Sequence, residues 1–351
     1  LRNRDFRLLF IGFAIGQMLM PLQFFTQIFW VQQNAPRDVW LLLVSLIGAS
    51  RGIGALTFGL YGGALADRMD RRKLLLITQS LLFLTTLAIA GLILFSDGSA
   101  SAFMLFFAMT FLASGLQSID APTRLALVPD ILGPKLTAAG LSLNQAAGQL
   151  SMPVALFASG LIIDALGFGG AYLLSSVGHV VVIIAIVLMS FPMTFGDRVR
   201  HRGAYGFGQA IRDVRYGLSY ARNHPVILWI IILLATMMGF GFPATANLGP
   251  TWITTVVGVE IKYVGFVAMT WGIGAFLTAA AMARFSSFEH RGALIAVGTT
   301  LFSLAFVVFV IDHSVVNAVI GNFGLGAGMT MAMLSSTILI QHMVPNEVRG
   351  R

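Results

Sequence analysis

The stretch GGALADRMDRRKLLL, from Gly62 to Leu76, concentrates charge between two long apolar runs. Seven consecutive positions within it, 67–73, hold two acids and four bases in the order DRMDRRK. The whole chain is 57% hydrophobic and only 10% charged, whereas soluble proteins average about 25% charged residues. So few charges cannot cover the surface of a soluble globule. The composition therefore predicts a polytopic membrane protein in which this stretch is a turn between two spanning segments.

Composition also excludes several kinds of site. The chain has no cysteine, so it can form no disulfide, thiolate nucleophile or cysteine-bound metal site. It contains no HExxH motif and no GxxxxGK(S/T) phosphate-binding loop. We therefore expect no enzymatic activity, no catalytic residue, and no metal or organic cofactor. The net charge of +8 does not predict a nucleic-acid partner, because the bases lie in short loops and form no stripe.

Ten apolar segments approach or exceed the ~20 residues that a spanning helix needs. They are too long for strands and lack the alternation of strands, and an open sheet cannot satisfy its backbone in a bilayer. We therefore expect an all-α integral membrane bundle. The predicted spans are Leu8–Val31, Val39–Gly63, Leu74–Phe95, Ala102–Leu127, Leu136–Leu166, Ala171–Phe191, Val226–Trp252, Val264–Phe285, Ala293–Ile311 and Val315–Met343.

The distribution of bases predicts how the chain crosses the membrane. When the N-terminus and then every second loop are assigned to one side, that side receives 19 of the 22 Lys and Arg residues. The three exceptions are Arg37, Lys262 and the intrahelical Arg51. Loops rich in Lys and Arg stay in the cytoplasm. We therefore expect a multi-pass protein of the cell (inner, cytoplasmic) membrane whose N-terminus and charged turn are cytoplasmic.

The two halves of the chain repeat. RGIGALTFG at Arg51 is echoed by WGIGAFLTA at Trp271, an offset of 220, and LVPD at Leu127 is echoed by MVPN at Met343, an offset of 216. Six predicted spans separate the members of each pair, so the halves cross the membrane in the same direction. Parallel repeats of this kind are a transporter architecture, with the substrate site near the membrane midplane between the repeats.

The repeat also predicts the domain organisation. We expect an N-terminal six-helix bundle over residues 1–191, a cytoplasmic linker with an amphipathic helix over 192–224, and helices seven to ten over 225–351. The counterpart of the sixth helix would lie beyond Arg351. We therefore expect the sequence to cover the first ten helices of a twelve-helix architecture.

GALADRMDRRK resembles the loop between helices two and three of the major facilitator superfamily, whose pattern is Gly-x-x-x-Asp-Arg-x-Gly-Arg-Arg or Lys. Asp70 stands where the family usually has Gly. LRNRDFRLLF at the start and VPNEVRGR at the end resemble the enterobactin exporters and macrolide efflux proteins of this superfamily. The resemblance implies a monomer in the lipid bilayer that exports a small molecule, a siderophore or drug, by alternating access driven by a proton gradient. An uptake symporter of the same fold and a membrane protein without transport activity remain open as alternatives.

The resemblance further implies that the charged turn is a conformational latch. Asp67 ends the second predicted helix, where the helix dipole disfavours an anion, so it needs compensation from a base or a helix N-terminus. Asp120 precedes Arg124 by one helical turn, and this pair is a candidate for the same network. The alternative is that the bases only anchor the topology. The expected latch residues are Gly63, Asp67, Arg68, Arg71, Arg72, Asp120 and Arg124.

In the superfamily, helices one, four, seven and ten line the substrate cavity. Their polar residues here, together with Arg51 near the midplane of helix two, form the expected substrate cavity: Gln17, Gln23, Gln27, Trp30, Arg51, Gln117, Asn247, Asn322 and Gln341. The alternative for each is a hydrogen bond in helix packing, which is also what we expect of His179. Gly148 and Pro153 resemble a degraded helix-five motif of drug–proton antiporters, with ordinary small-residue packing as the alternative.

Overall fold

The computed structural model describes residues 3–96, 98–190, 207–284 and 290–344, without the side chains of 60–64, 66–68, 207–211 and 213–214. The predicted linker residues 192–206 and the terminal motif from 345 onward lie outside the described residues. The chain divides into two compact units, Leu1–Phe207 and Gly208–Arg351. Its helices are α1 (Arg4–Asn34), α2 (Trp40–Arg68), α3 (Arg71–Phe95), α4 (Ala100–Leu132), α5 (Pro134–Val187), α6 (Phe207–Arg222), α7 (Pro225–Thr236), the π-helix η1 (Met237–Gly241), α8 (Phe242–Ala246), α9 (Gly249–Thr255), α10 (Ile261–Arg284), α11 (Arg291–Val310) and α12 (Val315–Met343).

The all-α prediction is confirmed, since the described residues form helices and no strand. Nine helical segments within them are long and apolar enough to cross a membrane. One of these, α5, has 54 residues and contains two predicted spans. They meet at Gly167, where φ of 66° and ψ of 177° break the helix in a region that favours glycine. With α5 counted twice, the described helices account for all ten predicted spans.

The seventh span is the most irregular one. It runs over Pro225–Thr255 and consists of α7, η1, α8 and α9 in succession. A π-turn and a proline inside a span both free backbone groups from the regular helical pattern. Pro243 is the second residue of α8, the helix that follows the π-turn. The apolar run over 226–252 predicts a single span and gives no sign of this interruption.

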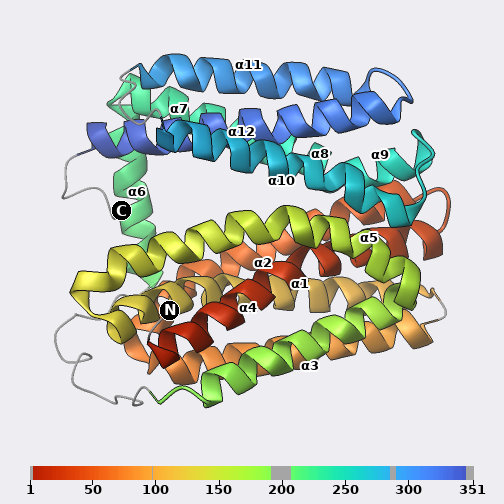
Figure 1. The fold of residues 1–351 in the computed structure, drawn as a ribbon, viewed down its shortest axis with the longest axis horizontal. Helices are drawn as coiled ribbons and strands as arrows, with labels where there is room; N and C mark the ends of the chain where they lie inside the picture. The colour runs from red at the N-terminus through yellow and green to blue at the C-terminus, as the bar shows by residue number, and fades with distance from the viewer. Residues whose placement is uncertain (1–2, 97, 191–206, 285–289, 345–351) are drawn as a thin grey trace. The chain divides into compact units, whose positions relative to one another are not determined.

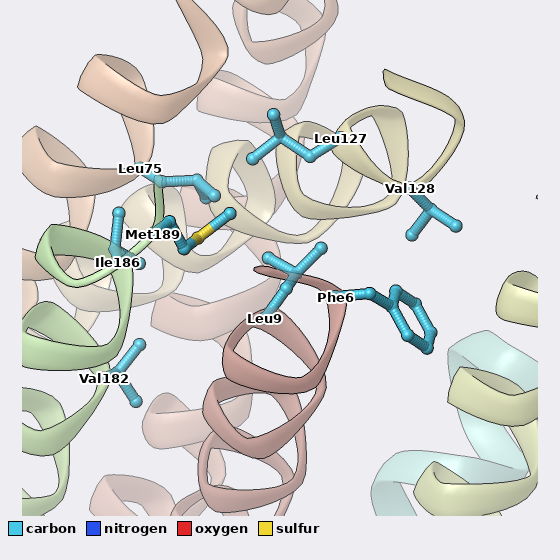
Figure 2. Close-up of a cluster of buried hydrophobic side chains, with 8 residues drawn as sticks. All are labelled: Phe6, Leu9, Leu75, Leu127, Val128, Val182, Ile186 and Met189. Carbon is cyan, nitrogen blue, oxygen red and sulfur yellow. The ribbon is translucent and has the colours of Figure 1, made fainter. Parts of the chain in front are cut away.

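The first unit is a bundle built from α1 to α5. In it, α1 packs on α5, α2 packs on α4, and α3 packs on both α4 and α5, as Figure 1 shows. A buried apolar cluster joins the starts of α1 and α3 to the ends of α4 and α5 (Figure 2). This cluster fixes four helices at the end of the bundle where the charged turn leads into α3. Its members are Phe6, Leu9, Leu75, Leu127, Val128, Val182, Ile186 and Met189.

Both units repeat one close helix contact. A Cβ atom on Gly54 of α2 would collide with the carbonyl oxygen of Phe111 on α4. In the second unit, a Cβ atom on Gly274 of α10 would collide with the carbonyl oxygen of Phe323 on α12. The two glycines are 220 positions apart and the two phenylalanines 212. The repeated sequence GIGA therefore supplies glycine at a helix crossing where the backbones approach too closely for a side chain.

Candidate functional site

The charged turn begins α3 with a side-chain cap. The Asp70 carboxylate accepts a hydrogen bond from the backbone N–H of Lys73, over 3.0 Å. Asp is among the preferred residues at this position because it satisfies a helix N–H group that has no backbone partner. The φ of Asp70 is −59°, so the turn needs no glycine. This explains how Asp can stand where the superfamily usually has Gly.

Arg71 and Arg72 connect the start of α3 to the ends of two other helices. Arg71 Nη1 donates to the carbonyl oxygen of Ala126 over 2.7 Å and forms an ion pair of 2.8 Å with Asp130, both on α4. Arg72 donates to the carbonyl oxygens of Ile186 and Val187, in the last turn of α5. Ile186 and Val187 are among the last carbonyls of α5, which lack the regular helical partner and carry the negative end of the helix dipole. The Ala126 carbonyl lies six residues before the end of α4. These bases therefore hold three helices of the first unit together.

Of the expected latch residues, the structure describes the side chains of four. Those of Gly63, Asp67 and Arg68 lie outside the described residues. The bonds of Arg71 and Arg72 to α4 and α5 stay within the first unit, and they do not join Asp120 or Arg124. Asp130, the partner of Arg71, is not among the site residues predicted from the sequence. The available signal was the LVPD motif, which ends with this acid ten residues, or ~15 Å along the helix, after Asp120.

Asp120 and Arg124 form a buried ion pair on α4. Asp120 Oδ2 lies 2.8 Å from Arg124 Nη2 and 3.3 Å from its Nε. The other carboxylate oxygen, Oδ1, accepts from Thr78 over 3.2 Å and from Gln79 over 2.8 Å, both on α3. A buried ion pair is tolerated when such additional hydrogen bonds satisfy its remaining lone pairs. Arg124 Nη1 has no partner among the described residues, and a Cβ atom added to Gly12 of α1 would lie 3.3 Å from it.

A chain of amides and an imidazole extends this ion pair across the unit. His179 on α5 lies with Nδ1 3.0 Å from Gln79 Oε1 and with Nε2 3.3 Å from Gln23 Nε2. A proton on Nδ1 lets His179 donate to Gln79 and accept from Gln23, so the donors and acceptors match; this tautomer follows from the bonding pattern. We call the group Gln23, Thr78, Gln79, Asp120, Arg124 and His179 the buried polar network. Gln23, which the sequence predicts to line the substrate cavity, is a hydrogen-bonded member of this network.

A second group surrounds Arg51. Its Nη1 donates to Gln27 Oε1 over 3.2 Å, and its guanidinium lies 5.0 Å from the centre of the Phe24 ring. The Gln27 amide nitrogen bonds in turn to Tyr172 Oη at 2.6 Å and Thr110 Oγ1 at 3.2 Å. No carboxylate of the described residues lies within ion-pair distance of Arg51. The structure thus brings together two of the expected cavity residues, Arg51 and Gln27, on neighbouring helices.

The other expected cavity residues differ in their burial and in their contacts. Trp30 is buried against Phe103 and Phe106, with ring centres 5.3 and 4.9 Å away. Asn322 donates to the carbonyl oxygens of Val267 and Ala268 on α10, so its amide serves helix packing. The remaining members are Asn247, buried at the break between α8 and α9, the half-buried Gln17 and Gln117, and the exposed Gln341.

The helix-five residues have a visible packing role. Gly148 faces Gln17 of α1, because a Cβ atom at this position would lie 2.9 Å from the Gln17 amide nitrogen. Pro153 lies inside α5, where it removes one backbone hydrogen bond. No group of three or more His, Cys, Asp or Glu side chains that could hold a metal ion occurs among the described residues.

Comparison with known proteins agrees with the fold and the loop motif. The profile of the family described as Major Facilitator Superfamily matches residues 8–351. No curated protein matches the chain. Among solved structures, a mutant of the nucleoside transporter NupG has a TM-score of 0.77 at 12% identity, with 99% of this chain and 85% of that chain covered.

Two further solved structures have the same fold. The xylose transporter XylE from E. coli, in a partially occluded inward-open conformation, has a TM-score of 0.67 at 16% identity over 97% of this chain and 86% of that chain. The peptide transporter POT has a TM-score of 0.70 at 15% identity over 97% and 83%. Identities this low establish the fold and leave the substrate open. The chain is therefore a multi-pass membrane protein of the transporter type, and it belongs to the Major Facilitator Superfamily.

Proposed function

We propose that the chain is a secondary active transporter that exports small amphipathic molecules, such as a siderophore or a drug, in exchange for protons. Membership of a transporter superfamily supports transport by alternating access. The sequence contains no phosphate-binding loop, which favours an ion gradient as the energy source. The similarity of the charged turn and the chain ends to siderophore and macrolide exporters favours export over uptake.

The buried polar network is the observation that carries the coupling proposal. Asp120 and His179 are titratable groups within an apolar bundle, where such groups are unfavourable and mark proton pathways. The network joins α1, α3, α4 and α5 through direct hydrogen bonds. A proton on Asp120 would neutralise the only acid paired with Arg124 within the described residues, leaving a buried cation to be compensated elsewhere. Protonation therefore favours a different packing of these helices, as alternating access requires.

Inverted membrane vesicles with an acidic interior test this function. The compounds are a catecholate siderophore, a macrolide and ethidium, and an acridine dye reports the pH gradient. We expect at least one compound, added outside, to collapse the gradient as protons leave in exchange. Asp120→Asn should abolish this response. Because that change leaves Arg124 unpaired in a buried site, the double variant Asp120→Asn/Arg124→Gln is measured beside it.

Asp312→Asn is the matched control, since Asp312 is exposed and, within the described residues, accepts only local hydrogen bonds, from Ser314 N over 2.8 Å and from Asn317 Nδ2 over 2.9 Å. This variant should respond like the wild type. A response that appears only when the compound is loaded inside the vesicles would indicate an uptake symporter. No response to any compound in either arrangement would contradict transport of these molecules, and a full response in both Asp120 variants would contradict the role of the network.

A further inference from the structure

Arg51 carries a positive charge close to the middle of a spanning helix. Helix α2 covers Trp40–Arg68, so Arg51 lies three residues from its midpoint, or ~4.5 Å along the axis. Charged side chains at such depth are unfavourable and face a protein interior or a water-filled path. The charge therefore requires a partner at the same depth.

The partners that the structure provides are neutral. Of the guanidinium nitrogens, only Nη1 has a hydrogen bond among the described residues, and its acceptor is the amide oxygen of Gln27. Gln27 is held in place by Thr110 and Tyr172, which take its amide nitrogen and leave its oxygen for Arg51. An arginine has five N–H donors in a planar fork. The remaining donors of this preoriented group can bind an anion through two parallel hydrogen bonds.

The helix crossing itself does not need this charge. Ser114 on α4 donates to the Arg51 carbonyl oxygen over 2.7 Å. In the second unit, Gly326 of α12 lies so close to the Trp271 carbonyl that a Cβ atom would collide with it. The offsets of 220 and 212 residues relate Trp271 to Arg51 and Gly326 to Ser114. One scaffold position is thus a neutral tryptophan in one unit and a cation in the other, so the charge serves a purpose beyond packing.

We propose that Arg51 binds the anionic group of the transported molecule, which makes the substrate class apolar molecules with a carboxylate, sulfonate or phosphate. This inference rests on the proposed transport function. The ring of Phe24 lies beside the guanidinium, and Met20, one turn earlier on α1, is 46% exposed. These side chains suit an apolar body next to the anionic group. Lipid phosphates lie outside a hydrocarbon core ~30 Å thick, so a free small molecule fits this depth better than a lipid headgroup.

Binding of two xanthene dyes of opposite charge tests the inference. Fluorescein, an anion, and rhodamine 123, a cation, are titrated onto the purified full chain in neutral detergent, and fluorescence anisotropy gives the dissociation constants. We expect wild type to bind fluorescein more tightly than rhodamine 123. Arg51→Gln should weaken fluorescein binding by about tenfold or more, as for loss of a charged hydrogen bond, without weakening rhodamine 123 binding. Arg51→Lys keeps the charge and should weaken fluorescein binding less.

Lys262→Gln is the control, because it removes a base that is paired with Glu260 at 2.8 Å in the second unit. It should leave fluorescein binding unchanged, and added phosphatidylglycerol should not displace the dye. Absence of fluorescein binding, equal binding in Arg51→Gln, or displacement by phosphatidylglycerol would overturn the proposal. The assay contains no proton gradient. A failed vesicle experiment with intact, Arg51-dependent binding would therefore contradict the proposed function alone.

Discussion

At the scale of single residues, the bases of the charged turn connect the start of one helix to two others. Arg71 and Arg72 at the start of α3 donate to carbonyls near the ends of α4 and α5. At the same end of the bundle, the Asp5 carboxylate accepts from the backbone of Ser190 over 2.8 Å. The cluster of charges thus has a structural role within the first unit, and this role does not depend on the predicted latch.

The Arg71–Asp130 ion pair should stabilise the first unit measurably. The Asp130 side chain is 12% exposed and the Arg71 side chain 26%, so solvent screens the pair only in part. We expect Asp130→Asn to destabilise the protein by about 1 kcal/mol, seen as a lower midpoint of thermal unfolding in detergent. Glu260→Gln breaks the Lys262–Glu260 pair, which has the same 2.8 Å length but a 69% exposed acid. It should have almost no effect, and equal losses in the two variants would contradict a stabilising role of the Arg71–Asp130 pair.

At the scale of helices, close backbone approach decides which elements pack together. Gly54 on α2 touches the backbone of α4 at Phe111, whereas a Cβ atom added to Gly52, two residues earlier, would have nothing within 4 Å. Both glycines lie inside the same helix. Substitutions at these two positions therefore distinguish the effect of glycine on the stability of the helix from its effect on helix packing.

Alanine at these two positions should change stability in opposite directions. Gly52→Ala should stabilise by up to ~1 kcal/mol, because alanine is the better helix former. Gly54→Ala should destabilise, because its Cβ atom forces α2 and α4 apart. Thermal unfolding of the two purified variants provides the comparison. Shifts of the same sign would show that the GIGA contact does not hold these helices together.

The sequence predicts the helices better than it predicts their partners. The ten spans follow from the lengths of apolar runs, and the break at Gly167 falls in the gap between two predicted spans. The π-turn before Pro243 cannot be predicted from hydropathy. The contacts of Asp130, Gln79 and Tyr172 depend on how each helix is rotated about its axis. Hydropathy does not fix that rotation in a chain that is apolar on most faces.

At the scale of the whole molecule, two units with the same internal contact provide the repeat that alternating access uses. The positive-inside rule predicts that both units begin on the cytoplasmic side. The chain has no cysteine, so any single introduced cysteine is the only thiol that a maleimide can label. Exposed positions at the two ends of the helices are therefore direct reporters of orientation.

The predicted orientation places Asp38 outside the cell and Lys135 in the cytoplasm, and both residues are exposed. In intact cells, a membrane-impermeant maleimide should label Asp38→Cys and should not label Lys135→Cys. Permeabilised cells should show labelling at both positions, which controls for reactivity. Labelling of Lys135→Cys from outside intact cells would reverse the assigned orientation.

We propose that protonation of the buried polar network switches the transporter between its states. Gln117→Cys on α4 lies at a half-buried predicted cavity position, and its rate of labelling by the maleimide reports this switch. The rate is measured in intact cells at external pH 5.5 and 7.5. Dividing it by the labelling rate of Asp38→Cys removes the pH dependence of the thiol reaction itself. We expect this ratio to change several-fold between the two pH values, and we expect Asp120→Asn/Arg124→Gln to remove the change. A ratio that is the same at both pH values, or a pH dependence that survives in the double variant, would contradict the proposal.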